Sequence, residues 1–285
     1  MKQKPIIGLV MKSLEAEFFQ EMKHGALAFA KKHTDFLLKT VGTNTQTEIE
    51  LQIELVNQLI REKVDAIVLI PIDSKALVPV TIKAIQAGIK VINIDIKLDE
   101  ELLKQQGIEL TYVGPDNKTA SNIVGNVLAK KLNKGAKVIL IEGLSVAENA
   151  QQRKAGFLES ISTYGLDLVA SEAADWETGK AEQVFERLFI QHPDVEGVMC
   201  SNDAMALGVL NVLERNDKTG AIPVIGFDND ASAQPFLKSG ALLATIDAFG
   251  SQMAVQGIEF ALKVLKGMEN KGSYSTDFKL VELIK

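Results

Sequence analysis

Short apolar runs alternate with amphipathic segments along almost the whole chain. The apolar runs are continuous, whereas the segments between them carry apolar residues at the 3.6-residue spacing of a helix. In the first part of the chain this pattern predicts strands at 6–11, 36–41, 64–70 and 90–95, and helices at 18–32, 47–63 and 74–87. Continuous apolar strands are typical of parallel sheets that helices cover on both faces.

A second series of the same kind follows. It predicts strands at 110–113, 136–142, 166–170, 197–201 and 223–227, and helices near 117–132, at 147–164, at 178–191 and after Asp203. Two βαβ series predict an α/β protein with two doubly wound parallel-sheet domains. Gly114 and Pro115 break the pattern between the two series and mark a candidate joint.

The C-terminal tail indicates how the two domains are connected. It contains a predicted strand at 242–246, a helix at 251–266 and a last strand at 278–284. If the chain crosses back near Asp247 and again near Asp277, the two sheets are balanced and three crossovers form a hinge with a cleft. We therefore expect one lobe from residues 1–114 and 249–276, and the other from residues 115–248 and 277–285.

Composition and charge exclude several classes. The 285 residues are 46% hydrophobic and 24% charged, with a formal net charge of −6. This charge argues against a nucleic-acid surface, which needs clustered basic residues. Cys200 is the one cysteine, so no disulfide forms within the chain, and its apolar neighbours favour a buried small hydrophobe over a reactive thiol.

The chain carries no apolar run of the roughly 18 residues that a membrane helix needs. It also enters its first strand by Ile6, without a signal peptide. Either the protein is cytoplasmic or the sequence begins after a removed leader.

An enzyme has little support in the motifs. The chain lacks a phosphate loop, a dinucleotide-binding glycine pattern and a nucleophile elbow, and His24, His33 and His192 show no metal-ligand spacing. We expect no cofactor and no metal. An α/β sugar isomerase or kinase with Asp95 or Asp228 as its base stays open as a rival class.

Polar side chains at strand ends are the main clue to function. Ligands of open parallel sheets bind at the carboxyl ends of the strands. Asn202 and Asp203 follow one apolar run and Asp228 follows another, as Asp95 does earlier in the chain. Ionised carboxylates accept hydrogen bonds from hydroxyl groups, although an Asp after a strand often caps a helix instead, a role that fits Asp203 and Asn117 better than Asp95.

Aromatic and basic residues near other strand ends complete the candidate set. Phe18 and Phe19 are either both core residues of the first helix or, because only one of them can point straight into the core, one of them faces the cleft as a stacking surface for sugar C–H groups. Lys12 is either a solvated strand end or a hydroxyl donor. Arg153 shares a predicted helix face with Asn149, unless it is an exposed surface arginine, and Trp176 is either a stacking platform or a cover for the core edge.

Taken together, these residues resemble the periplasmic sugar-binding proteins of the ribose-binding type and the effector domains of lactose-repressor-type regulators. The resemblance covers the whole chain. It rests on the segments 18–19, 114–117, 202–208 and 225–228, and on Arg153 ahead of Gly156 and Phe157. In that family two lobes close on one sugar around a hinge.

The resemblance implies that both lobes contact the ligand. It implies stacking by Phe18, Phe19 and Trp176, and polar contacts from Lys12, Asp95, Asn149, Arg153, Asn202 and Asp228. Lys12, the two phenylalanines and Asp95 would come from the first lobe, and the other residues from the second.

Three positions depart from the ribose-binding pattern. Ala16 stands where ribose binders place Asn, Ile96 followed by Lys97 where they place Arg, and Ala248 where they place Gln, although Asp247 is adjacent. Lost hydroxyl contacts change specificity strongly. We therefore expect another pentose, a hexose, a deoxyhexose or a short polyol, with Lys12 replacing one missing donor.

We therefore predict a monomeric solute-binding protein for a small neutral carbohydrate. It would serve the permease of an ABC-type importer in the periplasm or outside the cytoplasmic membrane, with no chemistry and no nucleic-acid partner. The alternative is the sugar-sensing effector domain of a lactose-repressor-type regulator. Such regulators carry an N-terminal helix-turn-helix, for which the first strand at Ile6 leaves no room unless the sequence is truncated.

Overall fold

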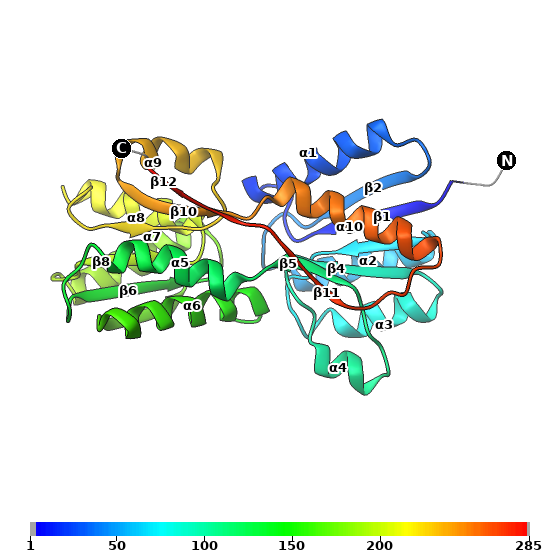
Figure 1. The fold of residues 1–285 in the computed structure, drawn as a ribbon, viewed down its shortest axis with the longest axis horizontal. Helices are drawn as coiled ribbons and strands as arrows, with labels where there is room; N and C mark the ends of the chain where they lie inside the picture. The colour runs from blue at the N-terminus through cyan, green and yellow to red at the C-terminus, as the bar shows by residue number, and fades with distance from the viewer. Residues whose placement is uncertain (1–3, 284–285) are drawn as a thin grey trace. The chain divides into compact units, whose positions relative to one another are not determined.

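The structure, a computed structural model, describes residues 4–283. Its internal contacts divide these residues into two units. Unit 1 contains residues 4–115, 146–148 and 249–276, and unit 2 contains residues 116–145, 149–248 and 277–283. Each unit is built around one six-stranded sheet (Figure 1).

Unit 1 is a βα repeat followed by a helix and a strand from the C-terminal part of the chain. Its strands are β1 (Ile6–Met11), β2 (Leu37–Gly42), β3 (Ala66–Leu69), β4 (Lys90–Ile94), β5 (Tyr112–Pro115) and β11 (Ser273–Thr276). Its helices are α1 (Glu17–Lys32), α2 (Ile49–Arg61), α3 (Val78–Gln86), α4 (Glu100–Gln105) and α10 (Gly250–Leu265).

The sheet of unit 1 has the strand order β11-β5-β4-β3-β1-β2, and its strand pairs are parallel. In this order the winding direction reverses between β1 and β3, which is where ligands bind in open sheets of this type. Helices α2 and α3 pack on a core that includes Val56, Leu59 and Val80.

Unit 2 repeats the same plan. Its strands are β6 (Lys137–Glu142), β7 (Asp167–Ala173), β8 (Gly197–Cys200), β9 (Val224–Ile225), β10 (Leu242–Asp247) and β12 (Lys279–Glu282). Its helices are α5 (Asn117–Ala129), α6 (Glu148–Tyr164, whose first residue belongs to unit 1), α7 (Thr178–Gln191), α8 (Asp203–Arg215), α9 (Gln234–Ser239) and the short 3-10 helix η1 (Ala231–Ala233).

The sheet of unit 2 has the order β12-β10-β9-β8-β6-β7. Its strand pairs are parallel except for β12, which runs antiparallel to β10 at the edge. The winding direction reverses between β6 and β8, so the equivalent ligand position lies at the ends of these two strands.

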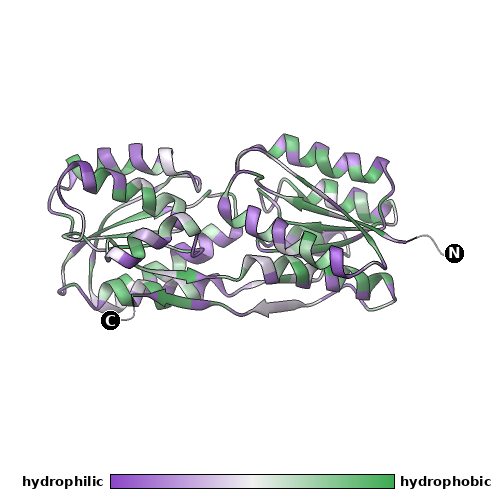
Figure 2. Cartoon of the chain, turned by 90° about the horizontal axis from the view of Figure 1, so that it is seen from above, coloured by the Kyte–Doolittle hydropathy of each residue, from purple (hydrophilic) through white to green (hydrophobic). Residues whose placement is uncertain are grey.

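The hydropathy pattern explains these layers. The central strands are fully buried, as in β3 and β8, whereas the edge strands β2 and β7 are partly exposed. Figure 2 shows mostly hydrophobic strands in the sheets and helices with one hydrophobic and one hydrophilic face. The predicted pair of parallel-sheet α/β domains is confirmed.

Most predicted elements are present, with shifted ends. Helix α3 begins at Val78 rather than at 74, because the side chain of Asp73 accepts hydrogen bonds from the backbone N–H groups of Lys75 and Ala76 and holds a turn there. The last strand ends at Glu282, and residue 284 of the prediction lies outside the described residues. The sequence pattern missed α4, α9, η1 and β11, which are short.

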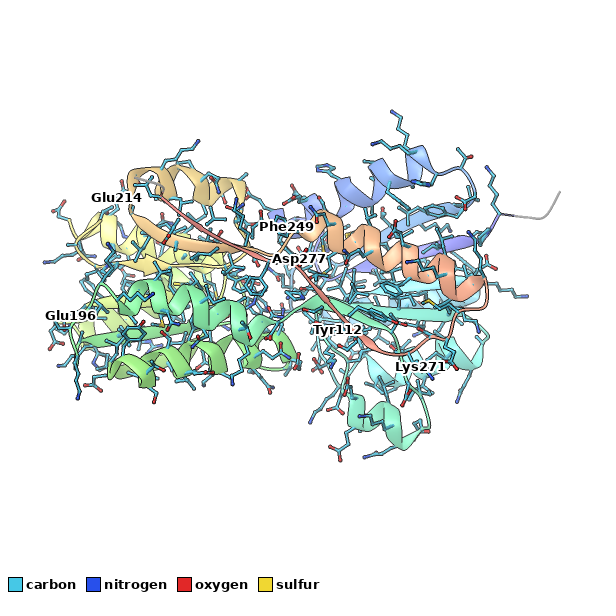
Figure 3. The ribbon with its side chains drawn as sticks, viewed as in Figure 1. Tyr112, Glu196, Glu214, Phe249, Lys271 and Asp277 are labelled. Carbon is cyan, nitrogen blue, oxygen red and sulfur yellow. The ribbon has the colours of Figure 1, made fainter. Side chains whose placement is uncertain are left out.

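The segment before β11 is tied to β5 by backbone and side-chain contacts. The N–H of Tyr112 donates to the carbonyl of Gly272 at 2.9 Å, and the side chain of Asn270 accepts from the N–H of Thr111 at 3.1 Å. Figure 3 labels Tyr112 and Lys271 in this region, and also Phe249 and Asp277, two of the residues at which the chain changes unit. Within residues 4–283, no helix is long and apolar enough to cross a membrane.

Candidate functional site

Lys12 and the two phenylalanines form one group in unit 1, directly after β1. The ammonium of Lys12 lies 5.5 Å from the centroid of the Phe19 ring, within the range of a cation–π contact. Lys12 is only 3% exposed. The carbonyl of Lys12 accepts a hydrogen bond of 2.6 Å from the hydroxyl of Thr43, which fixes the backbone where β1 ends. Lys12 is therefore not the solvated strand end that was one of the two predictions for it.

Phe18 and Phe19 are both buried, at 7% and 3% exposure. Their rings meet edge to face, with centroids 5.3 Å apart and planes at 85°, an arrangement that aromatic pairs favour. The Phe18 ring packs on Gly250, where an added Cβ would lie 2.9 Å from Cε2 of the ring. The helix that carries the pair has no side-chain cap at Ala16, and the hydroxyl of Ser13 instead accepts from the N–H groups of Glu15 and Ala16.

Asp95 follows β4 in a left-handed backbone conformation with φ of 64°. It is 2% exposed, its N–H donates to the carbonyl of Val113 at 3.0 Å, and its carbonyl accepts from the hydroxyl of Tyr112 at 2.9 Å. It caps no helix, since α4 begins at Glu100 and Asp99 caps it. Strained non-glycine residues cluster at functional sites, which favours a ligand role for Asp95.

Two buried amides, which the sequence analysis did not single out, hold the strand ends of unit 1. The side-chain NH₂ of Gln52 donates to the carbonyls of Met11 and Ile70, and its oxygen accepts from the N–H of Ile72. Asn93 does the same for the neighbouring strand end, donating to Leu69 and Ile96 and accepting from Leu98. The two amides thus fix the backbone just before Lys12, at Met11, and just after Asp95, at Ile96.

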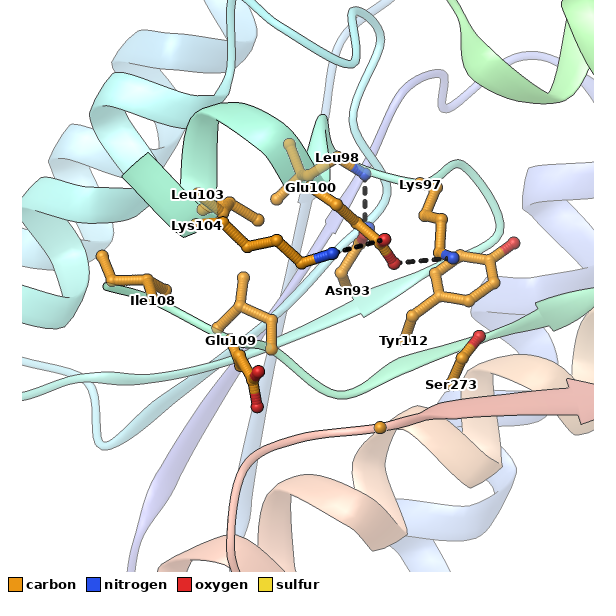
Figure 4. Close-up of a pocket in the computed structure, with 12 residues that line it drawn as sticks. Asn93, Lys97, Leu98, Glu100, Leu103, Lys104, Ile108, Glu109, Tyr112 and Ser273 are labelled. Carbon is orange, nitrogen blue, oxygen red and sulfur yellow. Dashed lines mark hydrogen bonds and ion pairs between the residues drawn. The ribbon is translucent and has the colours of Figure 1, made fainter. Parts of the chain in front are cut away.

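Asn93 also borders a pocket of about 220 Å³ beside α4 (Figure 4). One of its lining residues, Glu100, pairs with Lys97 at 2.7 Å and with Lys104 at 3.5 Å. The ammonium of Lys97 lies 5.3 Å from the centroid of the Tyr112 ring. The predicted ligand contacts of unit 1 are not among the lining residues, so this pocket is separate from them.

Arg153 is the centre of the candidate group in unit 2. It is 3% exposed, which excludes the surface-arginine alternative. Its Nε donates to Oδ1 of Asn117 at 2.9 Å, and its Nη1 donates to the carbonyl of Ser201 at 2.7 Å and to Oδ1 of Asp228 at 3.3 Å. Such a buried charge is tolerated because it is both paired and hydrogen-bonded.

Trp176 lies close to this guanidinium. The guanidinium carbon of Arg153 is 5.4 Å from the centroid of the indole ring. Trp176 is 2% exposed and has a backbone φ of 70°. The far end of the indole rests directly on Gly143, where an added Cβ would lie 2.1 Å from Cη2. Only a residue without a side chain fits there, so Gly143 makes the seat of the indole.

The capping residues differ from those predicted. Asn202, not Asp203, caps α8, because its Oδ1 accepts from the N–H of Met205 at 2.9 Å. Asp116, not Asn117, caps α5 through the N–H of Thr119. In both cases the predicted cap is one residue too late, because the side chains of Asp203 and Asn117 turn inward to Thr245 and Arg153 instead. The amide NH₂ of Asn202 lies 3.5 Å from the carbonyl of Trp176.

Asp228 sits in a turn with two successive left-handed residues, Asp228 with φ of 111° and Asn229 with φ of 60°. Its N–H donates to the carbonyl of Ile246 at 2.7 Å. Asp247, at the end of β10, accepts from the side chain of Asn229 at 3.1 Å and so belongs to the same cluster. Asn149 is 3% exposed on α6, and its Oδ1 is buried without a hydrogen-bond partner in the part of the chain that the structure describes.

Cys200 behaves as predicted. It is fully buried, and burial raises the pKa of its thiol well above the usual value, with the negative charge of Asp203 adding to the shift. A thiol held in its neutral form is a poor nucleophile.

Within each unit, the structure groups several of the predicted residues. In unit 1 it places Lys12 beside the Phe18–Phe19 pair and Asp95 at the end of β4. In unit 2 it joins Arg153, Trp176, Asn202 and Asp228, with Asp247 linked through Asn229. Their contacts with a ligand stay a prediction.

Comparison with known proteins identifies the family. The periplasmic binding protein domain family matches residues 7–269. The chain belongs to this family. It is a family of solute-binding proteins, and the resemblance to its ribose-binding type is confirmed by relatives over nearly the whole chain.

Two relatives illustrate the similarity. The D-ribose/D-allose-binding protein of Pseudomonas aeruginosa is 43% identical over 98% of this chain and 89% of its own length. The ribose import binding protein RbsB of Escherichia coli is 32% identical over 98% of this chain and 90% of its own length.

Solved structures agree. An ABC transporter solute binding protein from Burkholderia multivorans matches with a TM-score of 0.95 and 41% identity, over 98% of this chain and 99% of that one. A periplasmic solute binding protein from Actinobacillus succinogenes with bound D-allose matches with a TM-score of 0.92 and 34% identity, over 98% of both chains.

Proposed function

We propose that this periplasmic binding protein captures a small neutral carbohydrate outside the cytoplasmic membrane and delivers it, as a monomer, to the permease of an ABC-type importer. It catalyses no reaction. The relatives and solved structures named above are import or solute-binding proteins, which favours transport over the effector domain of a regulator.

The observation that carries the proposal is the hydrogen bonding of the buried Arg153 guanidinium. This buried guanidinium uses Nε and Nη1 for protein contacts, while no residue in 4–283 accepts a hydrogen bond from its Nη2. Two charge-assisted donors of fixed direction are thus left beside the carboxylate of Asp228. A hydroxyl can accept from the guanidinium and donate to the carboxylate at once, so adjacent sugar hydroxyls suit this pair.

Aromatic faces beside such polar groups support a sugar over other small polar ligands. A sugar ring presents C–H groups on its faces and hydroxyls at its rim. Trp176 in unit 2 and the Phe18–Phe19 pair in unit 1 are held rigidly, the first on Gly143 and the second on Gly250. Lys12 and Asp95 supply a donor and an acceptor in unit 1.

We further propose that one sugar contacts both sets of side chains. The two lobes would be residues 1–114 with 249–276, and residues 115–248 with 277–285. A ligand that binds both lobes favours the closed form over the open one by its differential affinity, and the permease would then recognise the closed form.

D-Ribose and D-allose are the first sugars to test, because relatives are named for them. The departures at Ala16, Ile96 and Ala248 argue for a different set of hydroxyl contacts from that of a ribose binder. D-Fucose and D-arabinose, which are bound in two further structural relatives, complete the panel.

Isothermal titration calorimetry of the purified protein against this panel tests the proposal. We expect one-to-one binding of at least one sugar, with Asp228→Ala and Trp176→Ala abolishing it while both variants keep the wild-type circular dichroism spectrum. The exposed Asp167→Ala is the matched control. Wild-type affinity in both site variants would refute the site, and no heat with any of the sugars would refute carbohydrate binding from this panel.

A further inference from the structure

The turn that carries Asp228 is strained. Asp228 and Asn229 both have positive φ values, of 111° and 60°, which cost free energy for residues with a side chain. Such a conformation persists only where surrounding contacts hold it. The contacts of the 227–230 turn therefore decide where the Asp228 carboxylate points.

Asp203 contacts both ends of this turn. Its N–H donates to the carbonyl of Phe227 at 2.7 Å, and its Oδ2 accepts from the N–H of Asp230 at 3.0 Å. Its Oδ1 accepts from the hydroxyl of Thr245 at 2.8 Å, and the same hydroxyl oxygen accepts from the N–H of Asn229 at 3.3 Å. The backbone N–H of Asp203 thus holds the Phe227 end of the strained turn, and its carboxyl, with Thr245, holds the end at Asn229 and Asp230.

The Asp203 carboxyl packs closely on Gly226. An added Cβ at Gly226 would lie 2.0 Å from its Oδ1, so the carboxyl packs directly on the backbone just before the turn. Asp203 is fully buried. Burial and the negative charge of Asp228 raise its pKa to about 8, although the bonds from Thr245 and Asp230 lower it. Near neutral pH the carboxyl is therefore held mainly as the neutral acid.

We propose that Asp203 is a positioning residue that sets the orientation of Asp228 and thereby the affinity for the sugar, without contacting the sugar itself. This inference rests on the proposed function. Asp203 is free for the role because Asn202 caps α8 in its place.

Three variants separate positioning from general stability. Asp203→Ala removes both carboxyl contacts, and Thr245→Val removes only the hydroxyl. Asp203→Asn keeps the acceptor for Asp230 and the size and neutral charge of the protonated acid, while its NH₂ donates to the hydroxyl oxygen of Thr245 in place of the carboxyl oxygen that accepts from it. Asp167→Asn, at an exposed position in the same unit, is the matched control.

The first readout is amide hydrogen exchange without sugar. We expect the N–H groups of Asn229 and Asp230 to exchange faster in Asp203→Ala and Thr245→Val while the central strand β8 stays protected. The second readout is calorimetry with D-ribose and D-allose. We expect the affinity to fall about tenfold or more in Asp203→Ala, less in Thr245→Val, and by no more than about threefold in Asp203→Asn.

Wild-type affinity in Asp203→Ala or, if that variant does not fold, wild-type affinity and exchange in Thr245→Val would overturn the inference. A wild-type protein that binds neither sugar would count against the proposed function instead. In that case unchanged exchange at Asn229 and Asp230 in the variants would still overturn the positioning role, because that measurement needs no ligand.

Discussion

The guanidinium carbon of Arg153 lies 3.6 Å from the centroid of the Phe227 ring. This distance places the planar group in contact with the ring face, where it is attracted by the ring quadrupole. Together with the bonds to Asn117 and Ser201, the stack fixes the arginine before any ligand arrives. Fixed donors lose little entropy on binding, so this contact contributes to affinity through preorganisation.

Replacing Arg153 by lysine should weaken sugar binding strongly. A lysine keeps the charge but loses the flat stack on Phe227 and the separate donors that bind Asn117, Ser201 and Asp228. We expect a loss of affinity of about tenfold or more in calorimetry. Arg187→Lys, at a partly exposed ion pair in the same unit, should bind as the wild type. Equal affinity of the two variants would contradict the role of Arg153.

Gly143→Ala should displace the indole of Trp176. The new methyl group would lie 2.1 Å from Cη2, so the ring has to move. Since Trp176 is the one tryptophan of the chain, its emission maximum should shift and its response to sugar should weaken. Gly179→Ala is the control, because no atom lies within 4 Å of its added Cβ. A Gly143→Ala spectrum identical to that of the wild type would exclude the proposed seat.

Gln52→Ala should destabilise unit 1. The substitution leaves the carbonyls of Met11 and Ile70 and the N–H of Ile72 without their amide partner in a fully buried place. Unsatisfied buried groups cost about 1–3 kcal/mol each, so we expect the free energy of unfolding to fall by at least about 2 kcal/mol in urea titrations. Gln86→Ala, at an exposed position of α3, should change it by less than about 0.5 kcal/mol. Equal losses of unfolding free energy in the two variants would show that the hydrogen bonds of the Gln52 amide do not stabilise unit 1.

Asp203 should make stability depend on pH. Its folded pKa of about 8 lies above the usual aspartate value of 3.8, so the folded state holds the proton more tightly than the unfolded chain. The stabilisation is fully present below about pH 4 and is lost as the pH rises through about 8. The unfolding free energy of the wild type, measured relative to that of Asp203→Asn, should therefore decrease as the pH rises from about 4 to about 8. A difference that stays constant from pH 4 to pH 8 would contradict a neutral Asp203.

The architecture was predictable because it depends on patterns that extend over many residues. Continuous apolar runs located the central strands, and helical spacing located the long helices, with α7 predicted from Thr178 to Gln191 as observed. Elements of four to six residues, such as α4 and β11, contain too few periods to be recognised. Helix α3 began late because a local side-chain bond at Asp73 prevailed over the apolar periodicity.

The sequence was enough to predict which strand ends carry the candidate site residues, but not the role of each residue there. The positions of Lys12, Asp95 and Asp228 followed from polar residues at the ends of apolar runs, and that of Arg153 followed from the helix face that it shares with Asn149. The choice between neighbours did not, because Asn202 and Asp203 are both possible caps and only the packing of Asp203 against Thr245 decides between them. Gln52, Asn93 and Gly143 were missed because their roles depend on partners that are distant in sequence, and the local sequence gives no sign of them.

The measurement that tests the central claim most directly is a sugar titration of Phe19→Ala, read by the fluorescence of Trp176. The altered residue belongs to unit 1 and the reporter to unit 2. If one sugar contacts both sets of side chains, the variant should need about tenfold or more sugar than the wild type to reach the same signal, whereas Phe29→Leu should not. A Phe19→Ala curve that saturates with the wild type would contradict a sugar site shared by the two units.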